Sequence, residues 1–284
     1  MKMDVAVIGS GTMGNGIAHV FAVAGFQVTL VDVNEEILNK ALSTIFEKMK
    51  RQAAKGLLTA QEAEESFKRI HRGIQVEDAR NAGIVIEAVP ERLELKHEIF
   101  SRLDKACPPA TILATNTSSI PIASLAAATK RPAKVIGMHF MNPVPVMKLV
   151  EIIRGLETSE ETYQTVQDLT LTLGKVPVCS KDSPGFISNR VLMPMINEAA
   201  WALREGVAKK EDIDRVMELG MNHPMGPLKL ADYIGLDTCL SILQVLESGF
   251  HNAKYAPCPI FQELIQAGRL GRKVGKGFYD YDER

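Results

Sequence analysis

Apolar and polar positions follow two different periods along the first two thirds of the chain. Short, nearly continuous apolar runs predict buried strands, and the stretches between them repeat apolar residues every three or four positions, as amphipathic helices do. The runs that predict strands lie at residues 3–8, 27–32, 83–89, 111–114, 134–139, 147–153 and 175–180. Strands that alternate with helices are typical of a doubly wound α/β sheet, which we expect over residues 1–184.

Two long helical segments interrupt this alternation. Residues 35–55 predict one helix, and Thr59 with Glu62 predicts a capping box at the start of a second helix, which runs to about residue 69. The pair is longer than a crossover between parallel strands needs. We therefore expect residues 35–70 to form a helical pair that projects from the sheet.

The pattern changes after Ser183-Pro184-Gly185. Helical spacing dominates from there on, with a strand predicted only at the Phe278–Tyr281 end. Pro194 lies inside the first helical segment, which predicts a kink there or a late start. The helical segments lie at 186–205, 209–220, 227–250 and 259–268. An all-α domain over residues 185–284 is the expectation.

A glycine-rich turn joins the first predicted strand to the first predicted helix. Gly9 permits the tight turn, Gly11 lets a pyrophosphate approach the backbone, and Gly14 lets the helix pack closely on the strand. Asp32, at the end of the second strand, would accept hydrogen bonds from a ribose and repel a 2′-phosphate. The pattern indicates a Rossmann-type domain that binds NAD rather than NADP. FAD, or a glycine-rich turn without a ligand, are the alternatives.

Polar residues follow the later strands, at the sheet edge where such folds bind ligands. Glu151 is flanked by apolar residues, and burying a carboxylate without a partner is costly. His139, on the neighbouring strand, can supply that partner, and a histidine held by a carboxylate suits general acid/base catalysis. A satisfied surface histidine is the alternative. Glu91, Lys96, Asn116, Ser118 and Asn142 are the other polar residues at this edge.

Composition excludes several classes of protein. Among 284 residues, 33 Lys and Arg balance 34 Asp and Glu, which argues against binding to nucleic acid or to a membrane surface. No apolar stretch is long enough for a transmembrane helix. The histidines and the four scattered cysteines lack metal-ligand spacing, and thiols in such positions indicate a reduced, cytoplasmic protein. A basic cluster at residues 48–55 is either a solvated helix face or a cradle for substrate phosphates.

Six stretches spread over nearly the whole chain carry a family resemblance. The chain resembles the L-3-hydroxyacyl-CoA dehydrogenase family, and most closely its bacterial 3-hydroxybutyryl-CoA dehydrogenase branch. The stretches are GSGTMGNGIA (9–18), IEAVPERLELK (86–96), ATNTSSIPI (114–122), GMHFMNPVPVMKLVEII (137–153), SPGFISNR (183–190) and NHPMGPLKLADYIGLD (222–237). Together they are far more specific than the glycine fingerprint.

The resemblance implies NAD-dependent oxidation of a short-chain (S)-3-hydroxyacyl-CoA, and the reverse reduction. It implies that His139 is the general base, that Glu151 holds it, and that Ser118 and Asn189 place the substrate oxygen. It also implies that the helical domain closes over the site and forms a homodimer. The implied NAD contacts are Gly9, Gly11, Thr12, Met13, Gly14, Asp32, Glu91, Lys96, Asn116, Ser118 and Asn142. The implied substrate contacts are Ser118, Asn142, Lys50 and Lys55, and the two lysines are implied to contact the CoA part of the substrate.

Two other functions stay open at this point. One is a dehydrogenase of a free hydroxy acid, without CoA. The other is an NAD-binding protein that has lost catalysis, although His139 and Glu151 are both retained.

Overall fold

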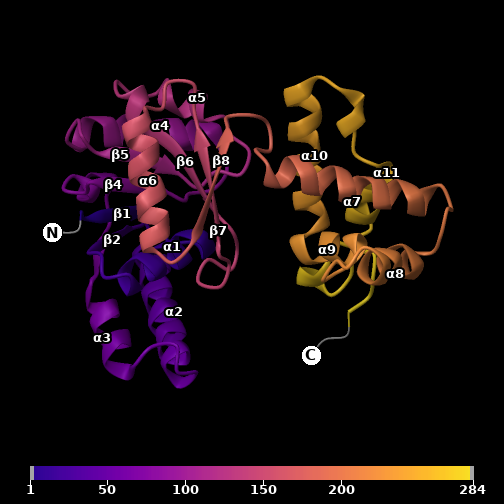
Figure 1. The fold of residues 1–284 in the computed structure, drawn as a ribbon, viewed down its shortest axis with the longest axis horizontal. Helices are drawn as coiled ribbons and strands as arrows, with labels where there is room; N and C mark the ends of the chain where they lie inside the picture. Colours follow the sequence, from indigo (N-terminus) through magenta and orange to yellow (C-terminus); the bar gives the residue numbers. More distant parts are fainter. Residues whose placement is uncertain (1–2, 282–284) are drawn as a thin grey trace. The chain divides into compact units, whose positions relative to one another are not determined.

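Residues 3–281 are described by the computed structural model, whose chain divides into two units, Met1–Ser183 and Pro184–Arg284 (Figure 1). The first unit is built on an eight-stranded sheet with the strand order β3-β2-β1-β4-β5-β6-β7-β8. Strands β3 to β6 along this order are parallel, β7 runs antiparallel to β6, and β8 is parallel to β7. The strands are β1 Val5–Ile8, β2 Val28–Val31, β3 Ile70–Gly73, β4 Ile84–Glu87, β5 Ile112–Thr115, β6 Val135–Phe140, β7 Leu149–Arg154 and β8 Val176–Lys181. This confirms the doubly wound sheet.

Helices cover both faces of the sheet (Figure 1). They are α1 Thr12–Val23, α2 Glu35–Ala54, α3 Ala60–Lys68, α4 Leu93–Ala106, α5 Ile122–Ala126 and α6 Glu160–Thr172, with a short 3₁₀ helix, η1, at Val76–Ala79. A large core cluster joins α1, α2 and α6 to one face of the strands. Met138 and Phe140 of β6 point into this core, so His139 between them points to the opposite face.

Two elements of the first unit escape the sequence prediction. Strand β3 contains the exposed residues His71 and Arg72, and pairs with β2 at the sheet edge without an apolar run. Helix α5 has five residues, too few for a periodic signal. The predicted capping box is confirmed: Thr59 N–H donates to Glu62 Oε2 at 2.7 Å, and Glu62 N–H donates to Thr59 Oγ1 at 3.1 Å.

The second unit is helical, as predicted. Its helices are α7 Ser188–Arg204, α8 Lys210–Gly220, α9 Pro227–Ile234, α10 Leu236–Phe250 and α11 Pro259–Gln266. Their inward faces share a separate core around residues such as Ile196, Leu243 and Phe261. No helix among the described residues is long and apolar enough to span a membrane.

Two details predicted for this unit are wrong. The single helix expected over 227–250 is two helices, because Gly235 takes a φ of +106°, which ends α9. Of the two alternatives predicted for Pro194, the late start is excluded, since α7 begins at Ser188 and includes Pro194, and the kink stays a prediction. The strand expected at Phe278–Tyr281 is an irregular segment with one isolated bridge, and Asp232 holds it by accepting hydrogen bonds from the backbone N–H groups of residues 278 and 279.

Candidate active site

The carboxyl ends of β1, β2, β4, β5 and β6 meet at one edge of the sheet, because these strands are parallel. Ligands in such sheets bind at this edge, near the point where the strand order reverses. Here the order reverses between β1 and β4. The predicted site residues of the first unit lie at or just after one of these strand ends or at the start of the helix or loop that follows, except Glu151, which lies inside β7 opposite His139, and Lys50 and Lys55.

The glycine turn after β1 has room for a ligand at one position only. A Cβ on Gly14 would lie 1.8 Å from the carbonyl oxygen of Gly9, so the helix needs glycine there to approach the strand. A Cβ on Gly11 would meet nothing within 4 Å, so this backbone faces open space. Thr12 opens α1, where unpaired backbone N–H groups favour a phosphate. The turn therefore fits the pyrophosphate of a dinucleotide.

A cavity of about 600 Å³ lies beside this turn. Asp32 lines it, and its carboxylate is held by Ser10, whose backbone N–H and Oγ donate to Oδ2 at 2.9 and 2.8 Å. The opposite wall comes from α4 and the loop after β4. The lining residues are Ile8, Gly9, Gly11, Thr12, Met13, Val31, Asp32, Val33, Ile37, Val76, Ala88, Val89, Pro90, Leu95, Glu98, Ile99 and Arg102. A mostly apolar slot whose charged lining residues are Asp32, Glu98 and Arg102 fits an adenosine.

His139 and Glu151 are directly opposite each other in the antiparallel pair β6–β7. His139 Nδ1 lies 3.2 Å from Glu151 Oε2, and both side chains are buried. The carboxylate accepts a hydrogen bond from Nδ1–H, and in this tautomer the lone pair of the imidazole lies on Nε2. The neighbouring positions Val150 and Ile152 belong to the core on the other face, which fixes the strand register. The predicted pairing of these two residues is confirmed, and their arrangement can accept and return a proton.

A buried charge network lies beneath the edge between β4 and β5. Lys96 Nζ contacts Glu87 Oε1 at 2.7 Å and Glu91 Oε2 at 3.3 Å, and Lys96 and Glu87 are 1% and 0% exposed. Thr115 Oγ1 donates to the second oxygen of Glu87 at 2.7 Å. Lys96 therefore holds Glu91 in place from below, and its predicted contact with NAD stays a prediction. Glu87 carries no motif signal beyond an acid inside an apolar strand, and the sequence analysis missed it.

Glu91 ties the loop after β5 to the loop after β4. It accepts hydrogen bonds from the hydroxyl of Thr117, the hydroxyl and backbone N–H of Ser119, and the backbone N–H of Ser118 at 3.0 Å. Burial opposes the charged form, but Lys96 and these donors together hold the pKa of Glu91 below its ordinary value. The carboxylate is therefore charged at neutral pH and positions Ser118.

Two further polar residues flank His139. Asn116 Oδ1 accepts a hydrogen bond from the backbone N–H of Phe140 at 2.8 Å, so it links the end of β5 to the residue after His139. Asn142 is exposed in the loop between β6 and β7. Lys175 holds that loop, since its buried ammonium donates to the carbonyls of Val144 and Met147 at 2.6 and 2.7 Å. No sequence motif indicated Lys175.

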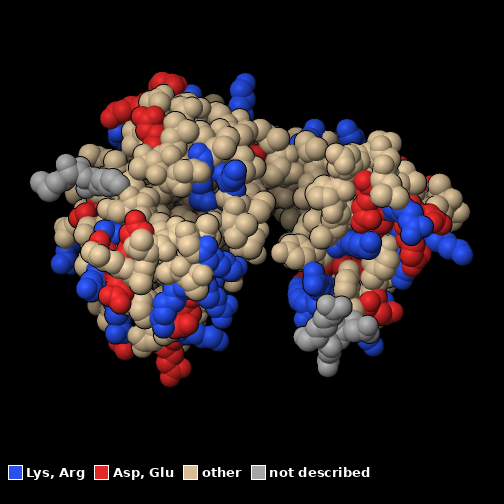
Figure 2. All heavy atoms as spheres, turned by 60° about the horizontal axis from the view of Figure 1, so that its bottom comes forward, with Lys and Arg blue, Asp and Glu red and all other residues tan. Residues whose placement is uncertain are grey.

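The remaining candidates lie away from this edge. Basic side chains gather on the surface over α2 (Figure 2), where Lys50 and Lys55 are exposed. Lys50 is paired with Glu47 at 2.6 Å, and Lys48 donates to Asn15 Oδ1 at 3.1 Å. Asn189 lies in the second unit, in the first turn of α7, and is buried there.

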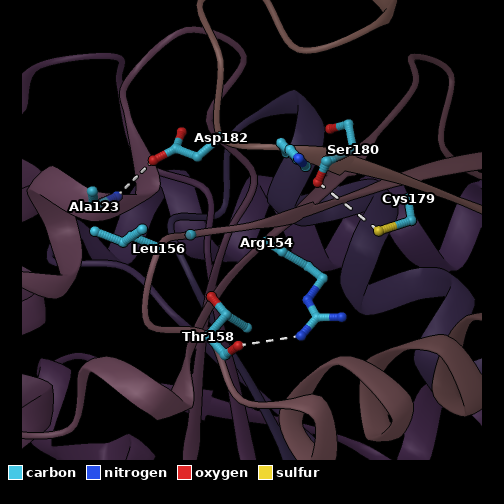
Figure 3. A pocket seen from close by; sticks show the side chains of 9 residues that line it. Ala123, Arg154, Leu156, Thr158, Cys179, Ser180 and Asp182 are labelled. Atoms are coloured by element: carbon cyan, nitrogen blue, oxygen red, sulfur yellow. Dashed lines mark hydrogen bonds between the residues drawn. The ribbon is translucent and has the colours of Figure 1, made fainter.

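A second hollow, of about 770 Å³, lies where β7 and β8 end (Figure 3). Arg154, Leu156, Cys179 and Asp182 line it, and none of the predicted site residues does. The charge of Arg154 is engaged by Glu160 at 2.7 Å, and Asp182 accepts a hydrogen bond from the backbone N–H of Ala123. This hollow is therefore separate from the edge that carries His139.

A dinucleotide that takes up hydride needs a proton acceptor near its substrate, and one edge of this sheet carries both a dinucleotide cradle and a His–Glu pair. Fold and site thus define a Rossmann-type, nicotinamide-dependent oxidoreductase. The family model of the 3-hydroxyacyl-CoA dehydrogenase NAD-binding domain matches residues 4–183 of the sequence. The family model of the 3-hydroxyacyl-CoA dehydrogenase C-terminal domain matches residues 185–281. The chain belongs to the 3-hydroxyacyl-CoA dehydrogenase family, and NAD is its cofactor.

Individual relatives are similar to this chain over nearly its full length. A probable 3-hydroxybutyryl-CoA dehydrogenase of Bacillus subtilis is 56% identical, covering 99% of this chain and 98% of that protein. A 3-hydroxybutyryl-CoA dehydrogenase of Bradyrhizobium diazoefficiens is 50% identical, covering 98% and 94%. The crystal structure of (S)-3-hydroxybutyryl-CoA dehydrogenase from Ralstonia eutropha is similar with a TM-score of 0.97 and 46% identity, covering 99% of this chain and 100% of that one.

Proposed function

We propose that the protein interconverts (S)-3-hydroxybutyryl-CoA and acetoacetyl-CoA with NAD. The pairing of His139 Nδ1 with Glu151 at 3.2 Å, on the sheet edge that also carries the glycine turn, is the observation that carries this proposal. The substrate of the relatives at 50–56% identity supports the choice of acyl group.

The bound cofactor supplies a hydride acceptor for the hydrogen on C3. His139 Nε2 takes the proton of the 3-hydroxyl as that hydrogen leaves, and returns it in the reverse direction. Glu151 faces Nδ1 and stabilises the imidazolium that forms, because the two groups are buried together. Burial keeps water from competing for the proton.

The other predicted contacts complete the proposed site. Ser118, positioned by Glu91, binds both the cofactor and the substrate oxygen, and Asn189 of the second unit supports it. Asn142 contacts cofactor and substrate from its exposed loop. Asp32 binds the ribose hydroxyls, and the basic surface over α2, with Lys50 and Lys55, binds the CoA phosphates (Figure 2). Gly9, Gly11, Thr12, Met13, Gly14, Glu91, Lys96 and Asn116 form the rest of the cofactor contacts.

Two wider features belong to the same proposal. The second unit, residues 185–284, closes over the site and forms a homodimer, in keeping with the family. The protein works in the cytoplasm, which agrees with the free thiols of Cys107, Cys179, Cys239 and Cys258.

The test is oxidation of NADH by the purified protein with acetoacetyl-CoA, and with acetoacetate as the second substrate. We expect thioester-dependent oxidation that falls by about 10²–10⁴-fold in His139→Ala, with NADH binding retained. His97→Ala is the matched control, since His97 lies on α4 and bonds to Ser124. Turnover of acetoacetate alone would identify a hydroxy-acid dehydrogenase instead. NADH binding without turnover of either substrate would identify a non-catalytic NAD-binding protein.

A further inference from the structure

The cavity beside the glycine turn, which fits an adenosine, is lined by an arginine that is far from Asp32 in the sequence. Residues 33–35, after Asp32, include no arginine. Arg102 comes from the third turn of α4 and lines the same cavity as Asp32 and Val33. In Rossmann domains an arginine near the ribose accommodates the 2′-phosphate of NADP. Its presence here raises the question of why the site should take NAD.

Arg102 is held by a two-pronged ion pair. Its Nε donates to Glu77 Oε1 at 2.9 Å, and its Nη2 donates to Glu77 Oε2 at 2.8 Å. Glu98, one turn earlier on α4, lies 3.6 Å from Nη1. A planar fork on a carboxylate is the strongest arrangement that an arginine forms with one acid. The hydrogen bonds from Arg102 lower the pKa of Glu77, so the pair is charged on both sides at neutral pH.

The pair also connects elements on two sides of the cavity. Glu77 lies on η1, after β3, and Arg102 lies on α4, after β4. With Asp32, Glu98 and Glu77 each carrying one negative charge and Arg102 one positive charge, the group has a net charge of −2. A neutral 2′-hydroxyl enters such a site easily, whereas a 2′-phosphate meets repulsion from three acids and no available cation.

We propose that the Glu77–Arg102 ion pair is a determinant of cofactor selectivity, because it withholds the arginine of the cavity from a 2′-phosphate. Asp32 repels the phosphate directly, and Glu77 prevents Arg102 from compensating. The proposal rests on the NAD-dependent function given above. It implies that neutralising Glu77 releases the guanidinium from its two short hydrogen bonds and leaves it the longer contact with Glu98 at 3.6 Å. The guanidinium is 37% exposed and carries enough flexible length to turn toward the ribose.

The experiment measures the dissociation constants of NADH and NADPH by nucleotide fluorescence, which needs no turnover. In Glu77→Gln we expect the preference for NADH over NADPH to shrink by about tenfold, the scale of one charge-assisted hydrogen bond to phosphate. The gain should weaken at high salt, since the pair is half-exposed. Glu65→Gln is the control, because Glu65 is exposed, pairs with Arg69 and is not among the residues that line this cavity.

A double variant identifies the group responsible. Glu77→Gln with Arg102→Met should lose the gain in NADPH binding, because the freed guanidinium is gone. An unchanged preference in Glu77→Gln, with NADH still bound as in the unaltered protein, would overturn this proposal and leave the NAD-dependent function intact. An equal gain in the double variant would also overturn it, since relief of repulsion alone would then be sufficient. Failure of the unaltered protein to bind either nucleotide would instead refute the NAD-dependent function itself.

Discussion

Replacement of Lys96 by methionine tests the buried network that supports the cofactor edge. Methionine fills similar space but removes the ammonium that lies 2.7 Å from Glu87. Glu87 is fully buried, and among residues 3–281 its charge would retain the hydroxyl of Thr115 and the backbone N–H of residue 89 as partners. Breaking a buried pair by removing one partner costs about 3–5 kcal/mol, because an uncompensated charge stays behind.

That cost is large enough for a simple assay. For a unit of this size it corresponds to a fall in melting temperature of roughly 6–20 °C. Urea unfolding followed by circular dichroism gives the free energy directly. Lys105→Met is the matched control on the same helix: Lys105 is exposed near the end of α4, and its loss should change stability by less than about 0.5 kcal/mol.

The double variant with Glu87→Gln separates charge from packing. Neutralising Glu87 removes the stranded charge, so the double variant should recover about 1–3 kcal/mol relative to Lys96→Met alone. A Lys96→Met protein within 1 kcal/mol of the unaltered one would refute the reasoning, as would a double variant no more stable than the single one. In either case the network would not be what holds Glu91 and the loop after β5.

Three other predictions follow from single side chains. Gly11→Ala should leave urea stability unchanged, since its Cβ would meet nothing within 4 Å, and should abolish NADH binding by filling the space for the pyrophosphate. Gly14→Ala should lower both, because its Cβ would lie 1.8 Å from the carbonyl oxygen of Gly9; equal stability of the two variants would contradict this. The folded-state pKa of Glu91 is lowered, so its stabilising contribution is complete above the ordinary glutamate value and is lost as the pH falls through the lowered one. Glu91→Gln should therefore flatten the acid side of a stability–pH profile, and an unchanged profile would refute this. Lys175→Met should lower the free energy of unfolding by about 1–3 kcal/mol, since two carbonyls lose a buried donor. Urea unfolding measures this change, and an unchanged midpoint would show that Lys175 does not stabilise the loop between β6 and β7.

Local patterns determined most of what was predicted correctly. The apolar runs predict seven of the eight strands. For strands such as β1 and β4 the reason is that a strand buried on both faces must be apolar along its length, whereas β8 is largely exposed. The capping box at Thr59 depends on residues three apart, so the sequence suffices there. Glu151 stood out because a carboxylate in an apolar strand requires a partner, and the adjoining strand offered only one histidine.

Tertiary structure decided the remainder. Strand β3 is stabilised by the edge of β2 rather than by its own composition, and the helical period continued across Gly235, whose φ of +106° ends α9 in the folded chain. Arg102 is 70 residues from Asp32 in the sequence, yet both line one cavity. Strand order brings such residues together, and no local period encodes strand order. Local sequence patterns are therefore sufficient to predict the fold class and the His139–Glu151 pair, which adjoining strands hold in register. The partner of Arg102 depends on the fold, because Glu77 lies 25 residues away on another element. The partners of Lys96, Glu87 and Glu91, are near it in the sequence, and the turn from β4 into α4 brings their side chains together.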